Sequence, residues 1–235
     1  MPRVIHEPAF LLHARAYRET SALLEMLTRN HGRVGLIYKG AKRSHKRAAS
    51  LQPFCKLSLS WSGRGELYTL MDLEMRGMGQ LVTPRLKICG LYLNELIMNL
   101  VPRNSPSEAL YHCYETALGE LSSGAALEPT LRQFELYLLR LSGYGPQLEY
   151  EATSDETISR ESYYYYDNER GPVLAPPNAA QSSLVSGRTL LALQAAQLPD
   201  ATAAKESKRL LRSIIDYQLR GKSLLSREIM KYLVD

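Results

Sequence analysis

The spacing of the apolar residues changes near residue 84, and this change constrains the fold more than any other feature of the chain. Before it, apolar and polar residues alternate over 33–38 and over 54–76, with a turn at Gly63-Arg64-Gly65, as is typical of half-buried strands. Residues 9–14 form a further short apolar run. Residues 21–29 fit a helix or a strand, and their place before the Asn30-His31-Gly32 turn favours a strand. About five short antiparallel strands in the first 80 residues predict a small barrel.

After residue 84 the apolar residues recur at helical spacing. Helices are expected at 84–102, from 106, from 128 to Gly143, and at 187–197, 202–219 and 224–233. Residues 146–186 lose this periodicity and contain prolines, acids and a run of four tyrosines at 163–166, so an irregular insert is expected there. Strands followed by helices predict an α+β protein, with a barrel domain at 1–80 and an all-helical domain with this insert at 81–235.

The positive charge of the chain is concentrated in its first third. Residues 1–83 hold 13 Lys and Arg against 6 Asp and Glu, whereas the rest holds 16 against 18. Residues 26–65 contain no acid and nine cations: Arg29, Arg33, Lys39, Lys42, Arg43, Lys46, Arg47, Lys56 and Arg64. The densest part, 39–47, falls between two predicted strands and suits a loop that follows a phosphate backbone, where neutralised phosphates release counterions. The pattern favours a surface for single-stranded nucleic acid over a merely solvated loop.

Five aromatic residues accompany these cations: Tyr17, Tyr38, Phe54, Trp61 and Tyr68. Proteins that bind single strands combine basic grooves with aromatic platforms. Tyr38, at the edge of the basic loop, is the preferred candidate for stacking on bases. Phe54 and Trp61 are interpreted as barrel core. The tyrosines at 163–166 are interpreted as a strand that leads into a turn.

The sequence lacks the motifs of common enzymes. Residues 35–42 approach a phosphate-binding P-loop, but Ala41 stands where that motif needs lysine. The five histidines show no metal-ligand spacing, and Cys55, Cys89 and Cys113 form no CxxC pair, which predicts buried thiols in a reducing compartment. No apolar run approaches the roughly 20 residues of a membrane span. We therefore expect a cytoplasmic, non-enzymatic protein without cofactor, metal or membrane contact.

Several short motifs occur in an order that resembles one known family. They are Thr20-Ser21, Gly32-Arg33, Lys39-Gly40-Ala41-Lys42, Leu51-Gln52-Pro53-Phe54, Gly63-Arg64-Gly65-Glu66-Leu67, Tyr92-Leu93-Asn94-Glu95-Leu96, Leu131-Arg132-Gln133-Phe134-Glu135, Gly143-Tyr144-Gly145 and Ser226-Arg227-Glu228. Together they resemble the bacterial recombination mediators of the RecO family. The resemblance implies an N-terminal oligonucleotide-binding (OB) barrel, a helical domain and a nucleoid-associated role in DNA repair. That role would include binding single- and double-stranded DNA, annealing complementary strands and loading recombinase onto strands covered by single-strand-binding protein.

The resemblance also implies partners and particular residues. DNA backbone contacts are expected at Arg33, Lys39, Lys42, Arg43, Lys46, Arg47 and Arg64. The implied partners are RecR and the acidic C-terminal tail of the single-strand-binding protein. Arg132 is the expected cation for that tail, with Leu131 and Phe134 shaping an apolar pocket; the alternative is an ordinary ion pair of Arg132 with Glu128 or Glu135. Some members carry a four-cysteine zinc module after the Gly-Tyr-Gly turn, but residues 146–186 contain no cysteine. We therefore expect no zinc and an insert held by other contacts, such as those of the tyrosines.

Three alternatives remain on the sequence alone. An RNA-binding barrel protein would share the N-terminal pattern. A protein-interaction scaffold would use the basic loop to meet an acidic partner. A nuclease would need a cluster of acids for metal ions, and the basic stretch has none.

Overall fold

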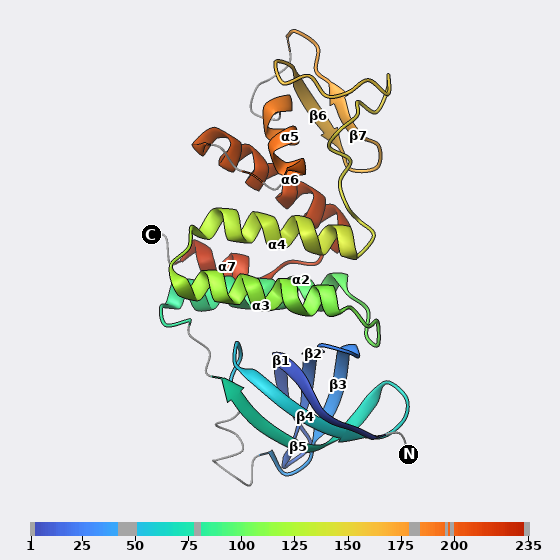
Figure 1. Ribbon diagram of the computed structural model, residues 1–235, viewed down its shortest axis with the longest axis vertical. Coiled ribbons are helices and arrows are strands. Elements are labelled where there is room, and N and C mark those ends of the chain that lie inside the picture. The colour runs from blue at the N-terminus through green and yellow to red at the C-terminus, as the bar shows by residue number, and fades with distance from the viewer. Residues whose placement is uncertain are drawn as a thin grey trace. The chain divides into compact units, whose positions relative to one another are not determined.

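A computed structural model describes residues 3–41, 51–77, 81–178, 184–195, 197 and 200–232. Its N-terminal part contains five strands, β1 (Arg3–Tyr17), β2 (Ser21–Thr28), β3 (Gly32–Tyr38), β4 (Lys56–Ser62) and β5 (Leu67–Gly77). They pair in the order β1-β2-β3-β5-β4, and β4 pairs back onto β1, so the sheet closes into a barrel (Figure 1). Only β3 and β5 run parallel. The predicted five-stranded barrel, and the strand at 21–29, are confirmed.

The first strand is longer than the expected run at 9–14. It continues through Pro8 because its two halves have different partners: residues 3–9 pair with β4 and residues 9–17 pair with β2. The register shifts between Val4 and Glu7 and again between Leu11 and His13. These irregularities hide the period of two in the sequence while letting one strand turn the barrel's corner.

The barrel core consists of the inward residues of all five strands. Val34, Leu36 and Tyr38 from β3 meet Leu24 and Met26 from β2, while Leu57, Leu59 and Trp61 come from β4. Trp61 is only 3% exposed, which confirms its interpretation as core. The opposite faces of β2 and β3 form the outside of the barrel.

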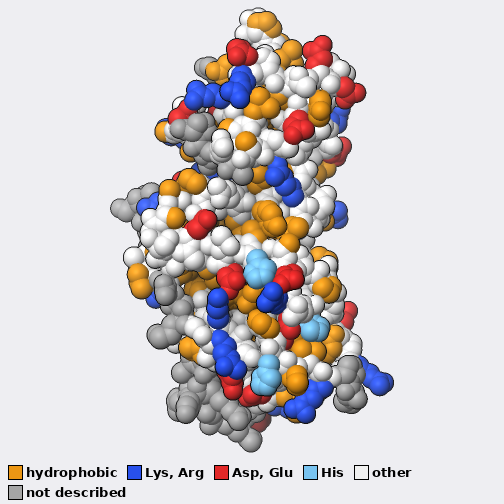
Figure 2. Space-filling model, in the orientation of Figure 1, with side chains coloured by type: hydrophobic (Ala, Val, Ile, Leu, Met, Phe, Trp, Pro, Cys, Tyr) orange, Lys and Arg blue, Asp and Glu red, His pale blue; other side chains and the backbone are white. Residues whose placement is uncertain are grey.

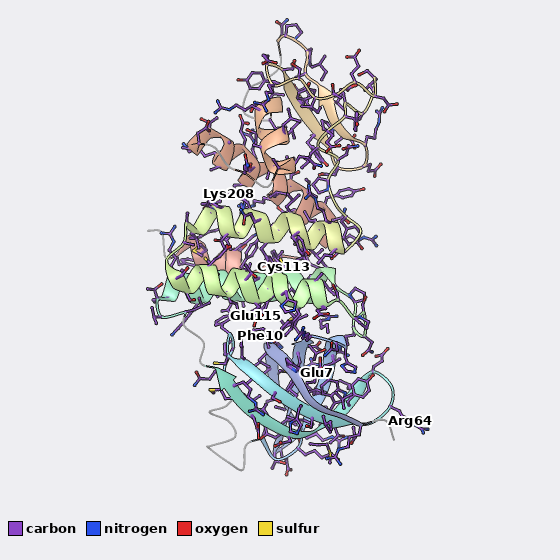
Figure 3. All side chains as sticks on the ribbon, viewed as in Figure 1. Glu7, Phe10, Arg64, Cys113, Glu115 and Lys208 are labelled. Carbon is purple, nitrogen blue, oxygen red and sulfur yellow. The ribbon has the colours of Figure 1, made fainter. Side chains whose placement is uncertain are left out.

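Three helices belong to the same compact unit as the barrel: α2 (Pro84–Leu100), α3 (Glu108–Ser123) and α7 (Leu225–Lys231). The helix α2 begins at Pro84, as the sequence predicts. Thr83 caps it by accepting a hydrogen bond from the backbone N–H of Leu86 at 3.2 Å, and Pro84 occupies the first turn. Phe10 leaves the barrel and lies 5.2 Å from the rings of both Tyr111 and Tyr114 on α3 (labelled in Figure 3). This aromatic cluster joins the barrel to the helices.

A buried polar pair and a helix cap complete this unit. The Asn94 amide on α2 donates to the Leu12 carbonyl at 3.0 Å and accepts from the Tyr114 hydroxyl at 2.5 Å. Glu95 accepts from the backbone N–H groups of Leu225 and Ser226, each at 3.0 Å, and so holds the first turn of α7 against α2.

The second compact unit covers residues 124–223. It contains α4 (Leu127–Leu141), α5 (Gly187–Gln194) and α6 (Ala201–Leu219), and a sheet of β6 (Tyr163–Asp167), β7 (Gly171–Leu174) and β8 (Val185–Ser186) in the order β7-β6-β8. The sequence predicts an irregular insert in an all-helical domain, and the structure places this small sheet in it. The tyrosine run forms β6, as interpreted. Tyr164 is 3% exposed, and its hydroxyl accepts from the Ser159 N–H at 2.9 Å.

A buried carboxylate organises the loops around this sheet. Glu151 accepts hydrogen bonds from the backbone N–H groups of Thr153 (2.8 Å), Ser154 (2.6 Å) and Leu174 (3.2 Å). Burial acts to raise the pKa of Glu151, but these donors stabilise the carboxylate and lower its pKa to about 2.

The compact units differ from the domains expected at 1–80 and 81–235. Contacts group residues 1–123 with 224–235, so α2, α3 and α7 belong with the barrel. The expected boundary at residue 80 marks the change from strands to helices. Within the described ranges, no helix is long and apolar enough to cross a membrane.

Candidate nucleic-acid interface

Several cations of the acid-free stretch are engaged with the helices beside the barrel. Arg29 at the end of β2 pairs with Glu108, and Lys56 on β4 pairs with Glu115, both on α3. Figure 3 shows Glu115 on the side of α3 that faces the barrel, and Figure 2 shows acidic and basic side chains next to each other at this junction. The hydrogen bond from Arg29 lowers the pKa of Glu108. These pairs join the barrel to α3.

Arg33, a predicted DNA contact, has a partner in the protein. Its Nη1 donates to the carbonyl oxygen of Met98, in the last turn of α2, at 2.6 Å. The side chain is half-buried, and this desolvation lowers the pKa of its guanidinium. The structure therefore ties Arg33 to α2, and a role in DNA contact stays a prediction.

Part of the outer face of β2 and β3 is covered. In OB barrels, this face and the loops around it commonly bind oligonucleotides. Arg103, from the segment between α2 and α3, pairs with Glu25 on β2, and its Nε lies 3.2 Å from Glu25 Oε2. Its guanidinium passes over Gly35 so closely that a Cβ there would lie 3.1 Å from the central carbon. Among the described residues, the other end of this face, around Ile37 and Lys39, borders a pocket.

Five exposed cations of the barrel, Arg3, Arg15, Arg18, Lys39 and Arg64, form no ion pair within the described residues. Arg64 lies in the β4–β5 turn and points away from the body of the barrel (Figure 3). Arg18 lies in the β1–β2 turn, with its guanidinium carbon 5.2 Å from the centre of the Tyr17 ring. This is the geometry of a cation–π pair.

A pocket of about 320 Å³ lies between the β1–β2 turn and the end of β3. We call it the turn pocket. It is lined by Tyr17, Arg18, Thr20, Ser21, Ile37, Lys39 and Gly40. Its walls combine two cations, two hydroxyls, an aromatic ring and an aliphatic side chain. Two residues with left-handed backbone, Arg18 (φ 51°) and Gly40 (φ 70°), turn the chain on either side of it.

The remaining predicted DNA contacts fall into two groups. Lys42, Arg43, Lys46 and Arg47 lie outside the described residues; in the sequence they follow directly after Ala41. Tyr38, the preferred stacking candidate, is only 7% exposed and belongs to the barrel core. The stacking prediction for Tyr38 is therefore corrected, because the alternation along β3 turns this side chain inward and its neighbours Ile37 and Lys39 outward.

Sequence reasoning missed Arg18, and it named Tyr17 only as one of five aromatic residues that accompany the cations. The window without acids begins at residue 26, after Glu25, so a search for uniform charge passes over the β1–β2 turn. The usable signal is a cation beside an aromatic residue at the end of an apolar strand. Pairing of β1 with β2 and of β2 with β3 then brings this turn to the end of β3 that carries Lys39.

The predicted partner site on α4 is buried within its own unit. Arg132 is 5% exposed, with Nη2 at 2.5 Å from Glu135 Oε1 and Nη1 at 3.9 Å from Glu128 Oε2. Leu131 (8% exposed) and Phe134 (2% exposed) are core residues. The ion pairs considered as the alternative for Arg132 are present. Binding of an acidic tail by these residues stays a prediction.

The cysteines lie in structural positions. Cys55 and Cys89 are buried, and burial raises the pKa of Cys113 to about 12, so its thiol is protonated at neutral pH. In the described part of the chain, no group of three or more His, Cys, Asp or Glu side chains is placed to hold a metal ion.

Comparison with known proteins places the whole chain in one family. The model "Recombination protein O N terminal" matches residues 1–78, and "Recombination protein O C terminal" matches residues 85–228. The DNA repair protein RecO of Methylococcus capsulatus is 46% identical over 230 residues, which cover 97% of this chain and 94% of that protein. Those of Nitrosococcus oceani (44% identical; 98% and 94% covered) and of Azoarcus sp. (40% identical; 99% and 98% covered) are similar over the same extent. The chain therefore belongs to the RecO family of DNA repair proteins.

Proposed function

We propose that this protein binds single- and double-stranded DNA through the phosphate backbone and anneals complementary strands during recombinational repair, without catalysing a reaction itself. The observation that carries the proposal is a set of exposed cations on an OB barrel that form no ion pair within the described residues, among them Arg18 and Lys39 at the turn pocket and Arg64 in the β4–β5 turn. In the sequence, Lys42, Arg43, Lys46 and Arg47 add four more charges directly after the pocket.

Annealing requires that the charge of two strands is neutralised while their bases remain free to pair. Contacts with phosphates position a strand without reading its sequence, so a cationic barrel surface meets both requirements. Such binding weakens steeply with salt because each neutralised phosphate releases counterions.

Loading of a recombinase onto covered strands would add protein partners, namely RecR and the acidic tail of the single-strand-binding protein. If Arg132 receives that tail, a carboxylate of the tail has to replace Glu135, which now lies 2.5 Å from the guanidinium. Arg132 would then exchange the carboxylate of Glu135 for one from the tail. The side chains packed around Leu131 and Phe134 would have to move apart to admit the tail.

A strand-annealing assay tests the proposal. Complementary strands are mixed with the protein at low and at high salt, with and without single-strand-binding protein. We expect faster annealing at low salt, and loss of DNA binding after charge reversal across Lys42, Arg43, Lys46 and Arg47 with an unchanged unfolding midpoint. DNA affinity that does not respond to salt would overturn the proposal. Tighter binding of RNA than of DNA would favour the RNA-binding alternative.

A further inference from the structure

We propose that the turn pocket takes one unstacked base of a single DNA strand and so gives the barrel a preference for single-stranded over duplex DNA. This inference rests on the proposed function, because it assigns a particular contact to the same barrel surface. The occupant is a nucleobase with its sugar, and the adjacent phosphates lie on the cations at the rim.

The size and lining of the pocket suit this ligand. Its volume of about 320 Å³ lies at the lower end of the roughly 300–1,000 Å³ of small-molecule pockets. Ile37 and the Tyr17 ring offer apolar contact for the face of a base, while the hydroxyls of Thr20 and Ser21 can donate to or accept from its polar edge. A paired, stacked base in a duplex cannot present its face and edge in this way.

Arg18 supplies a second surface for a base. Its guanidinium carbon lies 5.2 Å from the centre of the Tyr17 ring, within the range of a cation–π pair, so the ring and the guanidinium lie together at the pocket. Guanidinium planes and aromatic rings are the surfaces on which proteins stack unpaired bases. Arg18 holds this position with φ 51°, a left-handed conformation that is uncommon outside glycine and occurs more often at ligand-binding positions.

Lys39 completes the site on the other side of the pocket. It is exposed, and β3 directs it outward beside Ile37. A strand that inserts one base between the turn and β3 therefore has a cation on each side, Arg18 and Lys39. Holding a single base leaves the neighbouring bases free, which is compatible with annealing.

The test compares ligands as well as variants, using the full chain. Ligands are oligothymidylate, an abasic strand of the same length and a duplex, followed by fluorescence anisotropy. For the wild-type protein we expect binding to the abasic strand to be about tenfold weaker than to oligothymidylate, the effect of losing one base–aromatic stack. Because phosphates are equal in number in the two strands, the difference reports the base alone.

Tyr17→Leu should weaken binding of oligothymidylate by about tenfold and leave duplex binding within about twofold. Arg18→Lys keeps the charge but removes the planar group, so it should also weaken the single strand selectively. Tyr144→Leu, which changes an exposed tyrosine of the other compact unit, is the matched control and should alter neither ligand. Unfolding midpoints establish that each variant is folded.

The outcomes separate the two proposals. Equal wild-type affinity for the abasic strand and oligothymidylate would overturn the base pocket, even if Tyr17→Leu failed to fold, and would leave salt-sensitive DNA binding intact. Equal weakening of single strand and duplex by Tyr17→Leu would overturn it too. No binding of either DNA by the wild-type protein at low salt would instead overturn the proposed function.

Discussion

The division of the barrel cations into paired and available ones predicts which substitutions change the salt dependence of DNA binding. Lys39 and Lys56 form a matched pair, because both are exposed lysines of the same acid-free stretch. Lys39 has no ion pair within the described residues, whereas Lys56 pairs with Glu115. We expect Lys39→Ala to remove one phosphate contact and Lys56→Ala to remove none.

The magnitude follows from counterion release. For single-stranded nucleic acid, each phosphate contact contributes about 0.7 to the slope of log affinity against log salt. Between about 50 and 200 mM salt, one contact therefore accounts for roughly a 2.5-fold loss of affinity. Lys39→Ala should lower the slope by about 0.7, whereas Lys56→Ala should leave it unchanged and cost at most about 1 kcal/mol of stability, as exposed ion pairs do.

The assay is fluorescence anisotropy of a labelled single strand, titrated at several salt concentrations with both variants and the wild-type protein. Urea unfolding of the same samples establishes that the barrel remains folded. If Lys56→Ala lowers the slope as much as Lys39→Ala does, then Lys56 contacts DNA despite its ion pair with Glu115. The distinction between paired and available cations would then be wrong.

Three further predictions concern stability. Arg132→Ala removes the ion pair of buried Glu135 and should cost about 3–5 kcal/mol in urea unfolding, while Met at both positions should recover most of this; a wild-type midpoint for Arg132→Ala would contradict the buried pair. Gly32→Ala should cost roughly 3 kcal/mol or more in thermal unfolding, because φ is +67° and its Cβ would overlap the backbone of the loop between α2 and α3. Gly65→Ala, at φ +86° with open space around it, should cost only about 1–2 kcal/mol, and equal losses would refute the contact. Since the pKa of Glu151 falls from 4.5 to about 2 on folding, its carboxylate stabilises the fold above pH 4.5, and this contribution is lost as pH falls towards 2. Glu151→Gln should therefore unfold more easily at pH 7 and show a flatter pH dependence between 4.5 and 2, and an unchanged dependence would contradict this.

The strands and helices could largely be predicted from the sequence because their apolar periods are local. The alternation over 33–38 and 54–76 and the helical spacing that begins at residue 84 needed no knowledge of the rest of the chain. The full length of β1 could not be predicted. Its bulges interrupt the alternation of apolar and polar residues, and its two halves pair with different strands, β4 and β2. Of the sheet of β6, β7 and β8, the sequence predicted only the strand β6. The sheet was missed for a similar reason: β8 has two residues, and only its pairing with β6 makes it a strand.

Two expectations about binding residues, that for Tyr38, now corrected, and that for Arg132, still a prediction, gave more weight to the chemistry of a residue than to its position. The alternation that places Val34 and Leu36 in the core places Tyr38 there as well, so the sequence already argued against its role as a stacking platform. On α4, Arg132 is three residues from Glu135, and this spacing brings the two side chains together on one face of a helix. In both cases the local rule was available and agreed with the structure.

The basic stretch shows why charge along a sequence overstates a nucleic-acid surface. Residues 26–65 contain no acid, yet two of their cations form ion pairs with acids of α3. Arg29 pairs with Glu108, and Lys56 pairs with Glu115. A uniform run of charge therefore also serves to attach the barrel to a helix that carries the opposite charge. The cations available to an outside ligand are those that no neighbouring element reaches within the described residues, and two of them, Arg18 and Lys39, line the turn pocket. This argument moves the centre of the candidate interface away from Arg33 and Tyr38 and towards the turn pocket with Arg18 and Lys39.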